Sequence, residues 1–283
     1  MKRVGLLASG VGELGILQSL ENSFPGVDFV YWGDTARYPL SSKSEEVLLD
    51  SLQDGLDYMQ DQRVEAVVLA SADLALAWIL AYEEDARAEA DAAIEGEPNP
   101  MLETLFEPVG GAYGFCVLNP LPSFGAVLWR NSKAKKIGML AGETFIGSAL
   151  LPEIILSLDD GDCSIYAKES GLLGALAANG WRKRPETAMI VKKHIKPLKD
   201  RHIDVLAVTD ADSDLLLPQF EDKSGKRCSV ELFSFTVLDV AEEFLETQAL
   251  PEKQGRVEIF LTDYTENTLK NAKRFYHKKI SPA

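Results

Sequence analysis

The sequence predicts an α/β protein with two similar domains, each built on a parallel sheet. Short, almost continuous apolar runs alternate along the chain with longer segments that have helical spacing. Strands that are apolar on both faces are typical of parallel sheets covered by helices on each side. Two of these runs, Val4–Ala8 and Ile137–Ala141, resemble each other, and each opens one half of the alternating pattern.

The first half of the chain begins with a strand and a helix and repeats that pair twice. The apolar runs predict strands at Val4–Ala8, Val27–Trp32 and Ala66–Ala70. Helical spacing follows each strand, at Leu14–Glu21, Ser44–Gln60 and Leu74–Tyr82. The Ala-rich, acidic stretch Tyr82–Ile94 predicts a solvated helix that ends at Gly96–Pro100. Val109–Phe124 is rich in Gly, Pro and aromatic residues, which predicts an ordered loop.

The second half continues the alternation. It predicts strands at Ile137–Ala141, Ser164–Ala167, Val205–Val208, Val230–Phe233 and Arg256–Leu261. Helices are expected at Thr144–Leu158, Ser170–Asn179, Pro185–Asp200, Thr236–Glu246 and Glu266–His277. Pro152 is expected to kink the first of these helices.

Composition places the chain among globular proteins. Its 283 residues are 46% hydrophobic and 26% charged, and 44 acidic against 29 basic residues give a net charge of −15. Such acidity argues against general nucleic-acid binding, because phosphates would be repelled. No apolar run reaches the roughly 18–20 residues of a membrane span, and no signal peptide is expected at the start. Three widely spaced cysteines fit neither a disulfide framework nor a metal motif, which favours a reducing cytoplasm.

The negative charge is concentrated in one stretch. Residues 83–107 hold nine acidic residues and one basic residue, a local charge of about −8. Without this stretch the net charge would be only −7. The last helix is basic instead, which suits the negative end of its helix dipole.

A glycine pattern follows the first strand. Gly10, Gly12 and Gly15 match the G-x-G-x-x-G fingerprint of dinucleotide-binding folds, and Asp34 lies where an acid would bind the ribose. A nicotinamide-dependent oxidoreductase is therefore one hypothesis.

The residues around Asp34 form a second, tighter pattern. It reads Gly33-Asp34-Thr35-Ala36-Arg37-Tyr38-Pro39, with Lys43-Ser44 just beyond. Together with Ser9-Gly10-Val11-Gly12, this pattern resembles the glutamate racemase family, within the wider Asp/Glu racemase group. The resemblance extends through Ile137-Gly138-Met139-Leu140, His194–Lys199, Ile203–Leu206, Phe260–Asp263 and Ala272–Phe275. It covers nearly the whole chain except an acidic insertion at about 83–118.

The resemblance implies two opposed cysteines that move a proton at Cα, and neither is present. The family motif Ala-Cys-Asn-Thr corresponds here to Ala70-Ser71-Ala72-Asp73, and Gly-Cys-Thr-His-Tyr-Pro corresponds to Thr209-Asp210-Ala211-Asp212-Ser213-Asp214. Ser71 and Asp210 therefore stand at the two catalytic positions. The resemblance also implies that a ligand would lie beside Ser9, Pro39, Ser41, Ala72, Asp73, Ala211 and Asp212.

Neither replacement is a good base on sequence grounds. Ser71 has no evident partner base, and an ordinary aspartate has a pKa near 3.9, so Asp210 would need burial or a like charge to become one. The added carboxyls at Asp73, Asp210 and Asp212 would repel a dicarboxylate and favour an ammonium group or a hard cation such as Mg²⁺ or Ca²⁺. The alternative is that Asp212 and Asp214 are ordinary turn residues facing water.

Two main hypotheses follow. In the first, the protein is a pseudoenzyme that binds a small amino acid or cationic ligand in the interdomain cleft, with a regulatory role. In the second, it is an amino-acid racemase, isomerase or lyase with an altered mechanism through Asp210. We expect one domain from residues 1–121 and 227–283, a second from 122–226, and the ligand cleft between them. We expect no cofactor, no resident metal, no nucleic-acid or membrane partner, and, by resemblance, a homodimer.

Overall fold

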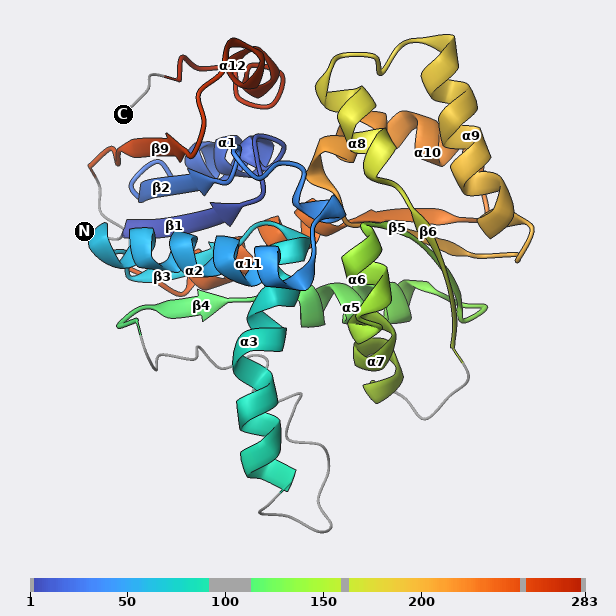
Figure 1. The fold of residues 1–283 in the computed structure, drawn as a ribbon, viewed down its shortest axis with the longest axis horizontal. Helices are drawn as coiled ribbons and strands as arrows, with labels where there is room; N and C mark the ends of the chain where they lie inside the picture. Colours follow the sequence, from blue (N-terminus) through green and yellow to red (C-terminus); the bar gives the residue numbers. More distant parts are fainter. Residues whose placement is uncertain (1–2, 92–112, 159–162, 250–252, 281–283) are drawn as a thin grey trace.

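The computed structural model describes residues 3–91, 113–158, 163–249 and 253–280; side chains at 83–91 are left out of the description. It contains two parallel sheets with helices packed around them (Figure 1), which confirms the predicted α/β class and its two similar halves. Each sheet is built from the apolar runs of one half of the pattern, except that the last strand returns to the first sheet.

The first sheet has the strand order β4-β3-β1-β2-β9. Its strands are β1 (Arg3–Ala8), β2 (Asp28–Gly33), β3 (Ala66–Leu69), β4 (Cys116–Leu118) and β9 (Val257–Leu261). All its pairs are parallel, and the register aligns Ala8 with Gly33 and Gly33 with Leu261. The carboxyl ends of β1, β2 and β9 therefore meet at one edge.

The second sheet has the order β6-β5-β7-β8. Its strands are β5 (Lys136–Ala141), β6 (Ser164–Glu169), β7 (Val205–Val208) and β8 (Ser229–Leu232). The pairing of β8 with β7 corrects the expected domain boundary: residues 229–232 lie in the second sheet, not in the first domain. The alternating pattern could not show this, because it does not say which sheet a strand joins.

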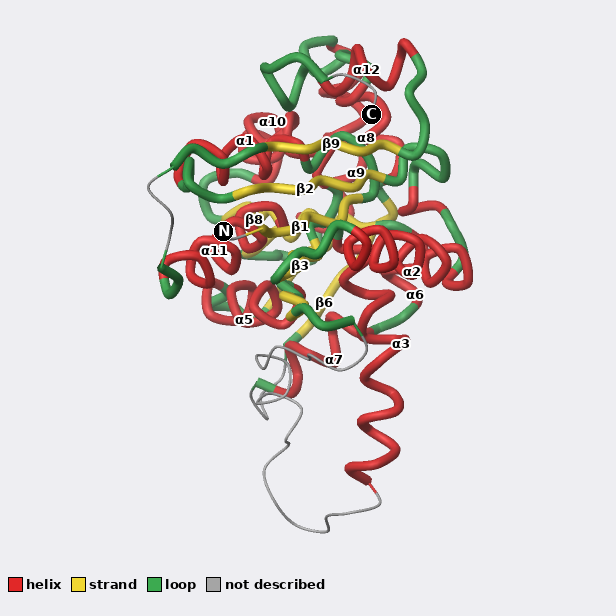
Figure 2. The backbone as a smooth tube through the Cα atoms, turned by 90° about the vertical axis from the view of Figure 1, so that its left-hand side faces the viewer, coloured by secondary structure: helices red, strands yellow, loops and turns green. Residues whose placement is uncertain are grey.

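The helices lie around the two sheets (Figure 2). They are α1 (Leu14–Ser23), α2 (Glu45–Asp61), α3 (Ala72–Asp91), α5 (Leu121–Asn131), α6 (Glu143–Gly147), α7 (Leu150–Ser157), α8 (Gly171–Ala178), α9 (Pro185–Lys199), α10 (Leu217–Ser224), α11 (Phe233–Glu246) and α12 (Glu266–Ala272). Two short 3₁₀ turns, η1 (Leu40–Ser42) and η2 (Ala211–Leu216), follow β2 and β7. The sequence pattern did not predict α5 or α10.

The predicted helix over 144–158 is broken, but not by its proline. The chain leaves helical geometry at Ala149, which has a left-handed φ of 56°, and α7 starts at the next residue. Pro152 lies in the first turn of α7, where its missing N–H leaves no helical hydrogen bond unmade. The expected kink is thus a full break three residues earlier.

The acidic segment begins on α3, which projects away from both sheets in Figures 1 and 2. The predicted solvated helix over Tyr82–Ile94 is confirmed as helix as far as Asp91, and residues 92–112 lie outside the described part. The insertion expected at 83–118 ends earlier than that, because residues 116–118 form β4 beside β3. The loop expected up to Phe124 is likewise replaced by β4 and the start of α5.

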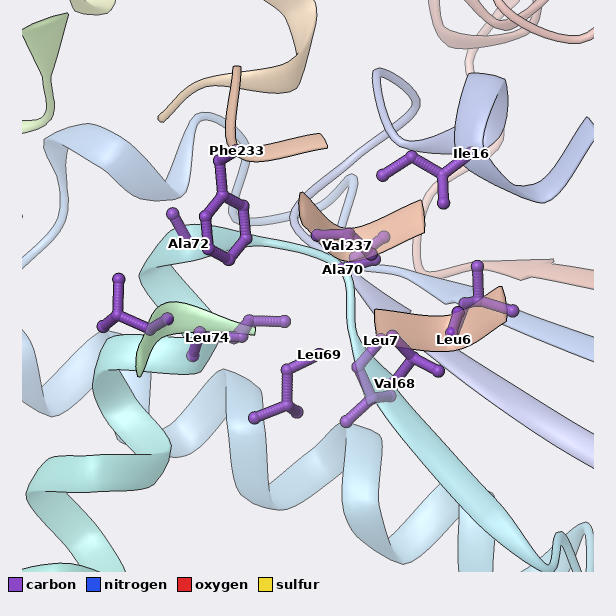
Figure 3. Close-up of a cluster of buried hydrophobic side chains, with 14 of the residues drawn as sticks. Leu6, Leu7, Ile16, Val68, Leu69, Ala70, Ala72, Leu74, Phe233 and Val237 are labelled. Carbon is purple, nitrogen blue, oxygen red and sulfur yellow. The ribbon is translucent and has the colours of Figure 1, made fainter. Parts of the chain in front are cut away.

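The core connects the two halves of the molecule. Leu69 of β3, Phe124 of α5 and Phe233 and Val237 of α11 are all buried in one cluster, part of which is shown in Figure 3. The Phe124 and Phe233 rings meet edge to face, with centroids 5.4 Å apart. Because α11 follows β8 of the second sheet and packs on β3 of the first, the two sheets share an apolar contact and are not simply linked by loops. Within the described residues, no helix is long and apolar enough to cross a membrane.

Asp34 joins the start and the end of the first sheet. It is fully buried and accepts hydrogen bonds from Ser51 Oγ (2.6 Å), Arg37 Nη1 (2.8 Å) and Thr262 Oγ1 (2.9 Å). Burial alone would raise the pKa of this carboxyl, but the hydrogen bonds outweigh it and the pKa is lowered. Asp34 is therefore a charged structural residue that ties the loop after β9 to the loop after β2.

Replacing Asp34 with alanine should lower the free energy of unfolding at pH 7 by roughly 3 kcal/mol, because the donors that bond to this carboxylate would lose their acceptor. Urea unfolding measures this. Asp54→Ala is the matched control: its carboxyl also pairs with Arg37 but is 56% exposed, so the loss should stay below about 1 kcal/mol. The gap between Asp34→Ala and wild type should shrink as the pH falls through the lowered pKa, and equal losses in the two variants would refute this role.

Candidate site in the interdomain cleft

A small cavity lies where the carboxyl ends of the strands from both sheets meet. Its lining residues are Ser9, Glu13, Tyr38, Pro39, Leu40, Ser41, Ser71, Asp73, Gly171, Thr209, Asp210 and Ala211. Its volume of about 10 Å³ is roughly that of one water molecule. Crevices at the carboxyl ends of parallel strands are the usual ligand sites of α/β folds, but this one is almost closed.

The structure brings most of the predicted site residues together. Ser9, Pro39, Ser41, Ser71, Asp73, Asp210 and Ala211 all lie on the cavity wall. Asp212 lies just behind the wall and is 3% exposed, so it is not a turn residue facing water. Ala72 does not line the cavity, because its methyl group packs in the hydrophobic core at the start of α3. What these residues bind or catalyse is a separate question.

Glu13 is a cavity residue that the sequence analysis missed. It is 2% exposed, and its Oε1 accepts hydrogen bonds from Ser9 Oγ (2.5 Å) and Ser9 N (3.2 Å). Burial raises the pKa of Glu13, the bonds from Ser9 oppose this, and the charge of Asp210 adds to the rise. Glu13 occupies a variable position of the glycine fingerprint, so no motif predicted it as a site residue. Its hydrogen bonds also occupy the hydroxyl and the backbone N–H of Ser9.

Asp212 and Tyr38 bridge the two domains. Tyr38 Oη, after β2, donates a 2.5 Å hydrogen bond to Asp212 Oδ2 on η2. The other oxygen, Oδ1, is buried and has no hydrogen-bond partner among the described residues. Burial and the nearby charges of Asp210 and Glu13 raise the pKa of Asp212 well above its ordinary value. The surroundings of this carboxyl therefore favour its protonated form.

Asp210, at the second cysteine position of the resemblance, has a structural task. Its Oδ1 accepts from Asp212 N (3.1 Å) and its Oδ2 from Ser213 Oγ (2.9 Å), so it caps η2. Oδ2 also lies directly against Gly174 of α8, where a β-carbon would overlap it. Burial raises the pKa of Asp210, and these hydrogen bonds oppose the rise.

Ser71, at the first cysteine position, has no activating base. It is 4% exposed and follows β3, across the cavity from the strand that leads to Asp210. No histidine, lysine, arginine or cysteine is among the described residues that line the cavity. The three cysteines, Cys116, Cys163 and Cys228, do not line the cavity. The hydroxyl therefore lacks the neighbour that would make it a nucleophile or a base.

The cavity wall carries carboxyls without compensating cations. Burial raises the pKa of Asp73 to about 7, and the charges of Asp210 and Glu13 contribute. Burial likewise raises the pKa of Asp214, again with Asp210 and Glu13 nearby. These groups are not a preformed chelate: the described residues contain no cluster of three or more acidic, histidine or cysteine side chains placed to hold a metal ion. A divalent-cation site is thus not built into the described part of the chain.

The glycine fingerprint has a structural explanation here. A β-carbon on Gly12 would lie 2.7 Å from Asp212 N, and one on Gly10 would lie 2.8 Å from the Tyr38 ring. The loop thus packs against protein at the place where a dinucleotide fold would receive a pyrophosphate. Asp34, the expected ribose-binding acid, is committed to Ser51, Arg37 and Thr262. These observations argue against the nicotinamide hypothesis.

Comparison with known proteins agrees with this geometry. No protein-family model matches the chain. The glutamate racemase of Thermoanaerobacter sp. (strain X514) is 27% identical over 282 residues, which covers 99% of this chain and 95% of the relative. The chain is a homologue of the glutamate racemases.

The racemase fold is shared along the whole length. Glutamate racemase isoform RacE1 from Bacillus anthracis superposes with a TM-score of 0.78 at 18% identity, covering 100% of this chain and 96% of the other. Glutamate racemase from Francisella tularensis in complex with D-glutamate gives a TM-score of 0.76 at 17% identity, covering 99% and 96%. The homologue thus keeps the two-sheet racemase architecture while lining its cleft with carboxyls.

Replacing Asp73 with the uncharged asparagine should stabilise the folded protein at high pH. The folded pKa of Asp73, about 7, exceeds the unfolded value of 3.8, so the proton stabilises the folded state at low pH and that contribution is lost as pH rises towards 7. Asp73→Asn should raise the free energy of unfolding at pH 8 by roughly 2 kcal/mol, about half of the full linkage because Asp73 is only half-buried.

Urea unfolding at pH 4.5 and pH 8 tests this. The two proteins should have nearly equal stability at pH 4.5, where wild-type Asp73 keeps its proton. Asp61→Asn, which changes an exposed carboxyl at the end of α2, is the control and should have little effect at either pH. A destabilising Asp73→Asn at pH 8 would show that the carboxylate has a compensating partner.

Proposed function

We propose that this protein is a glutamate racemase homologue that no longer racemises and binds a small amine-bearing ligand, such as an amino acid, in the interdomain cleft. The observation that carries the proposal is the composition of the cavity wall. Carboxyls from both halves face it, and neither a thiol nor a cationic side chain is among its described residues. A regulatory role in a cytoplasmic setting is part of the proposal.

Loss of racemisation follows from the two catalytic positions. Racemisation needs a base on one face of Cα and an acid on the other, each within hydrogen-bond reach. Ser71 offers a hydroxyl without a partner base. Asp210 has a raised pKa, but both of its oxygens are engaged in capping η2. One-sided proton transfer through Asp210 is the second candidate function, because that raised pKa makes it a better base than an ordinary aspartate.

Preference for a cationic group follows from charge. A dicarboxylate would bring like charge towards Glu13, Asp73 and Asp210, whereas an ammonium group would supply the missing counter-charge. Burying the ligand would also displace a proton, so its affinity rises with pH. The closed cavity has room for about one water, so the ligand enters when the domains separate and the Tyr38–Asp212 hydrogen bond opens.

Calorimetric titration should therefore show that L-lysine, L-ornithine or putrescine binds more tightly than D-glutamate, L-glutamate or succinate. From pH 6.5 to 8.5 the affinity should rise about fourfold, since an acid of pKa about 7 goes from about one quarter ionised to almost fully ionised. Asp210→Asn keeps the cap but removes the charge and should weaken binding roughly tenfold. Asp200→Asn, at the exposed end of α9, is the control. Tighter binding of glutamate, with affinity falling as pH rises, would refute the proposal.

Proton exchange at Cα separates the two candidate functions. With either enantiomer of glutamate or aspartate in D₂O, the wild type at high concentration should incorporate no deuterium at Cα, as followed by proton NMR. Exchange that is abolished by Asp210→Asn but kept by Asp212→Asn would instead establish the enzyme with an altered mechanism.

A further inference from the structure

The second domain carries an exposed basic surface that the cleft does not use. Residues 181–199 contain seven lysines and arginines and one glutamate, a local charge of +6 in a chain of net charge −15. The surface consists of the exposed side chains Arg182, Lys183, Arg184, Lys192, Lys193 and Lys196. Among the described residues, none of these six forms an ion pair. Their charge is therefore available to a partner.

The basic surface also exposes apolar side chains. Trp181 is 40% exposed and Met189 is 71% exposed. The Arg184 guanidinium lies over the Trp181 ring, 4.2 Å from its centre. Exposed tryptophan, methionine and arginine side chains are enriched at protein interfaces. The surface thus suits an acidic partner that also carries apolar residues.

The same chain contains a segment of that composition. Residues 83–107 carry nine acidic residues and one basic residue, and their second half includes Met101, Leu102, Leu105 and Phe106 between Glu97 and Glu107. The charges of about −8 and +6 are closely matched.

The outer end of α3 and the basic surface on α9 lie on opposite sides of one molecule. In Figures 1 and 2 the outer end of α3 is at the bottom, whereas α9 is in the upper half. After the acidic segment the chain returns to the same region, where Tyr113 Oη lies 3.1 Å from Tyr82 Oη. The described residues on either side of the segment are therefore on the other side of the molecule from α9, which favours the surface of a second copy as the partner.

We propose that the acidic segment 83–107 of one molecule binds the basic surface on the α9 helix of another. The contact joins two different surfaces, so it is heterologous and repeats head to tail into a ring or an open chain. It goes beyond ligand binding in the cleft and does not depend on it.

Sedimentation velocity of the full-length protein tests this at 0.1 M and 1 M NaCl. The wild type should form concentration-dependent species larger than a monomer at 0.1 M and dissociate at 1 M, because the screening length falls from about 10 Å to about 3 Å. Lys192→Glu/Lys193→Glu should weaken the association roughly tenfold or more. Lys133→Glu/Lys253→Glu makes the same change of charge at exposed positions elsewhere and should leave it intact.

Mixing a variant of the acidic segment with a variant of the basic surface makes the test specific. Glu95→Lys/Glu97→Lys/Glu103→Lys should also abolish self-association. Mixing this variant with Lys192→Glu/Lys193→Glu should restore complexes, because the unchanged acidic segment of the second variant meets the unchanged basic surface of the first. Circular dichroism confirms that each variant is folded.

Several outcomes would overturn the proposal. These are a wild type that is monomeric at 0.1 M NaCl, an association that survives Lys192→Glu/Lys193→Glu, and a mixture of the variants that does not associate. A monomeric protein that binds phosphatidylserine vesicles or duplex DNA through the same lysines would assign the basic surface to another partner.

Discussion

Carboxyl groups meet at the junction of the two sheets with no cationic side chain among the described residues that line the cavity, and much of the local structure accommodates them. Each must keep its proton, accept hydrogen bonds or receive a cation from outside. Asp212 accepts a hydrogen bond from the Tyr38 hydroxyl, and Glu13 accepts one from the Ser9 hydroxyl. Asp210 accepts one from the backbone N–H of Asp212. Gly12 and Gly174 leave room for these carboxyls at close range. The cavity is consequently small and polar, and burial raises the pKa values of its carboxyls.

The same residue type has the opposite role a short distance away. Asp34 is buried as well, yet Arg37 supplies its counter-charge and its pKa is lowered. Asp73 has no such partner among the described residues, and its pKa is raised to about 7. The first arrangement stabilises the fold at neutral pH and the second destabilises it. Proteins retain such unfavourable groups mainly where they function, which directs attention to the cleft and not to the motif around Asp34.

The sequence predicted the strands well because parallel strands are buried on both faces and appear as continuous apolar runs. It failed for β4 and α5, where Gly, Pro and aromatic residues resemble a loop, and it could not assign β8 to a sheet. In the cleft, family motifs brought Ser71, Asp73 and Asp210 to the same place, and the three residues line one cavity. Glu13 and Tyr38 were missed because their importance comes from contacts that form only when the chain is folded, and Ala72 was placed at the site although it faces the core.

The central claim is that burial, with no counter-charge among the described residues, raises the pKa values of the carboxyls in the cleft, that of Asp73 to about 7. Carbon-13 NMR of the side-chain carboxyls, followed as a function of pH in wild type and in Asp73→Asn, measures this directly. The account predicts a carboxyl that titrates near pH 7 in the wild type and is absent from the variant. A spectrum in which every carboxyl of the folded protein titrates below about pH 5, as exposed side chains do, would contradict it.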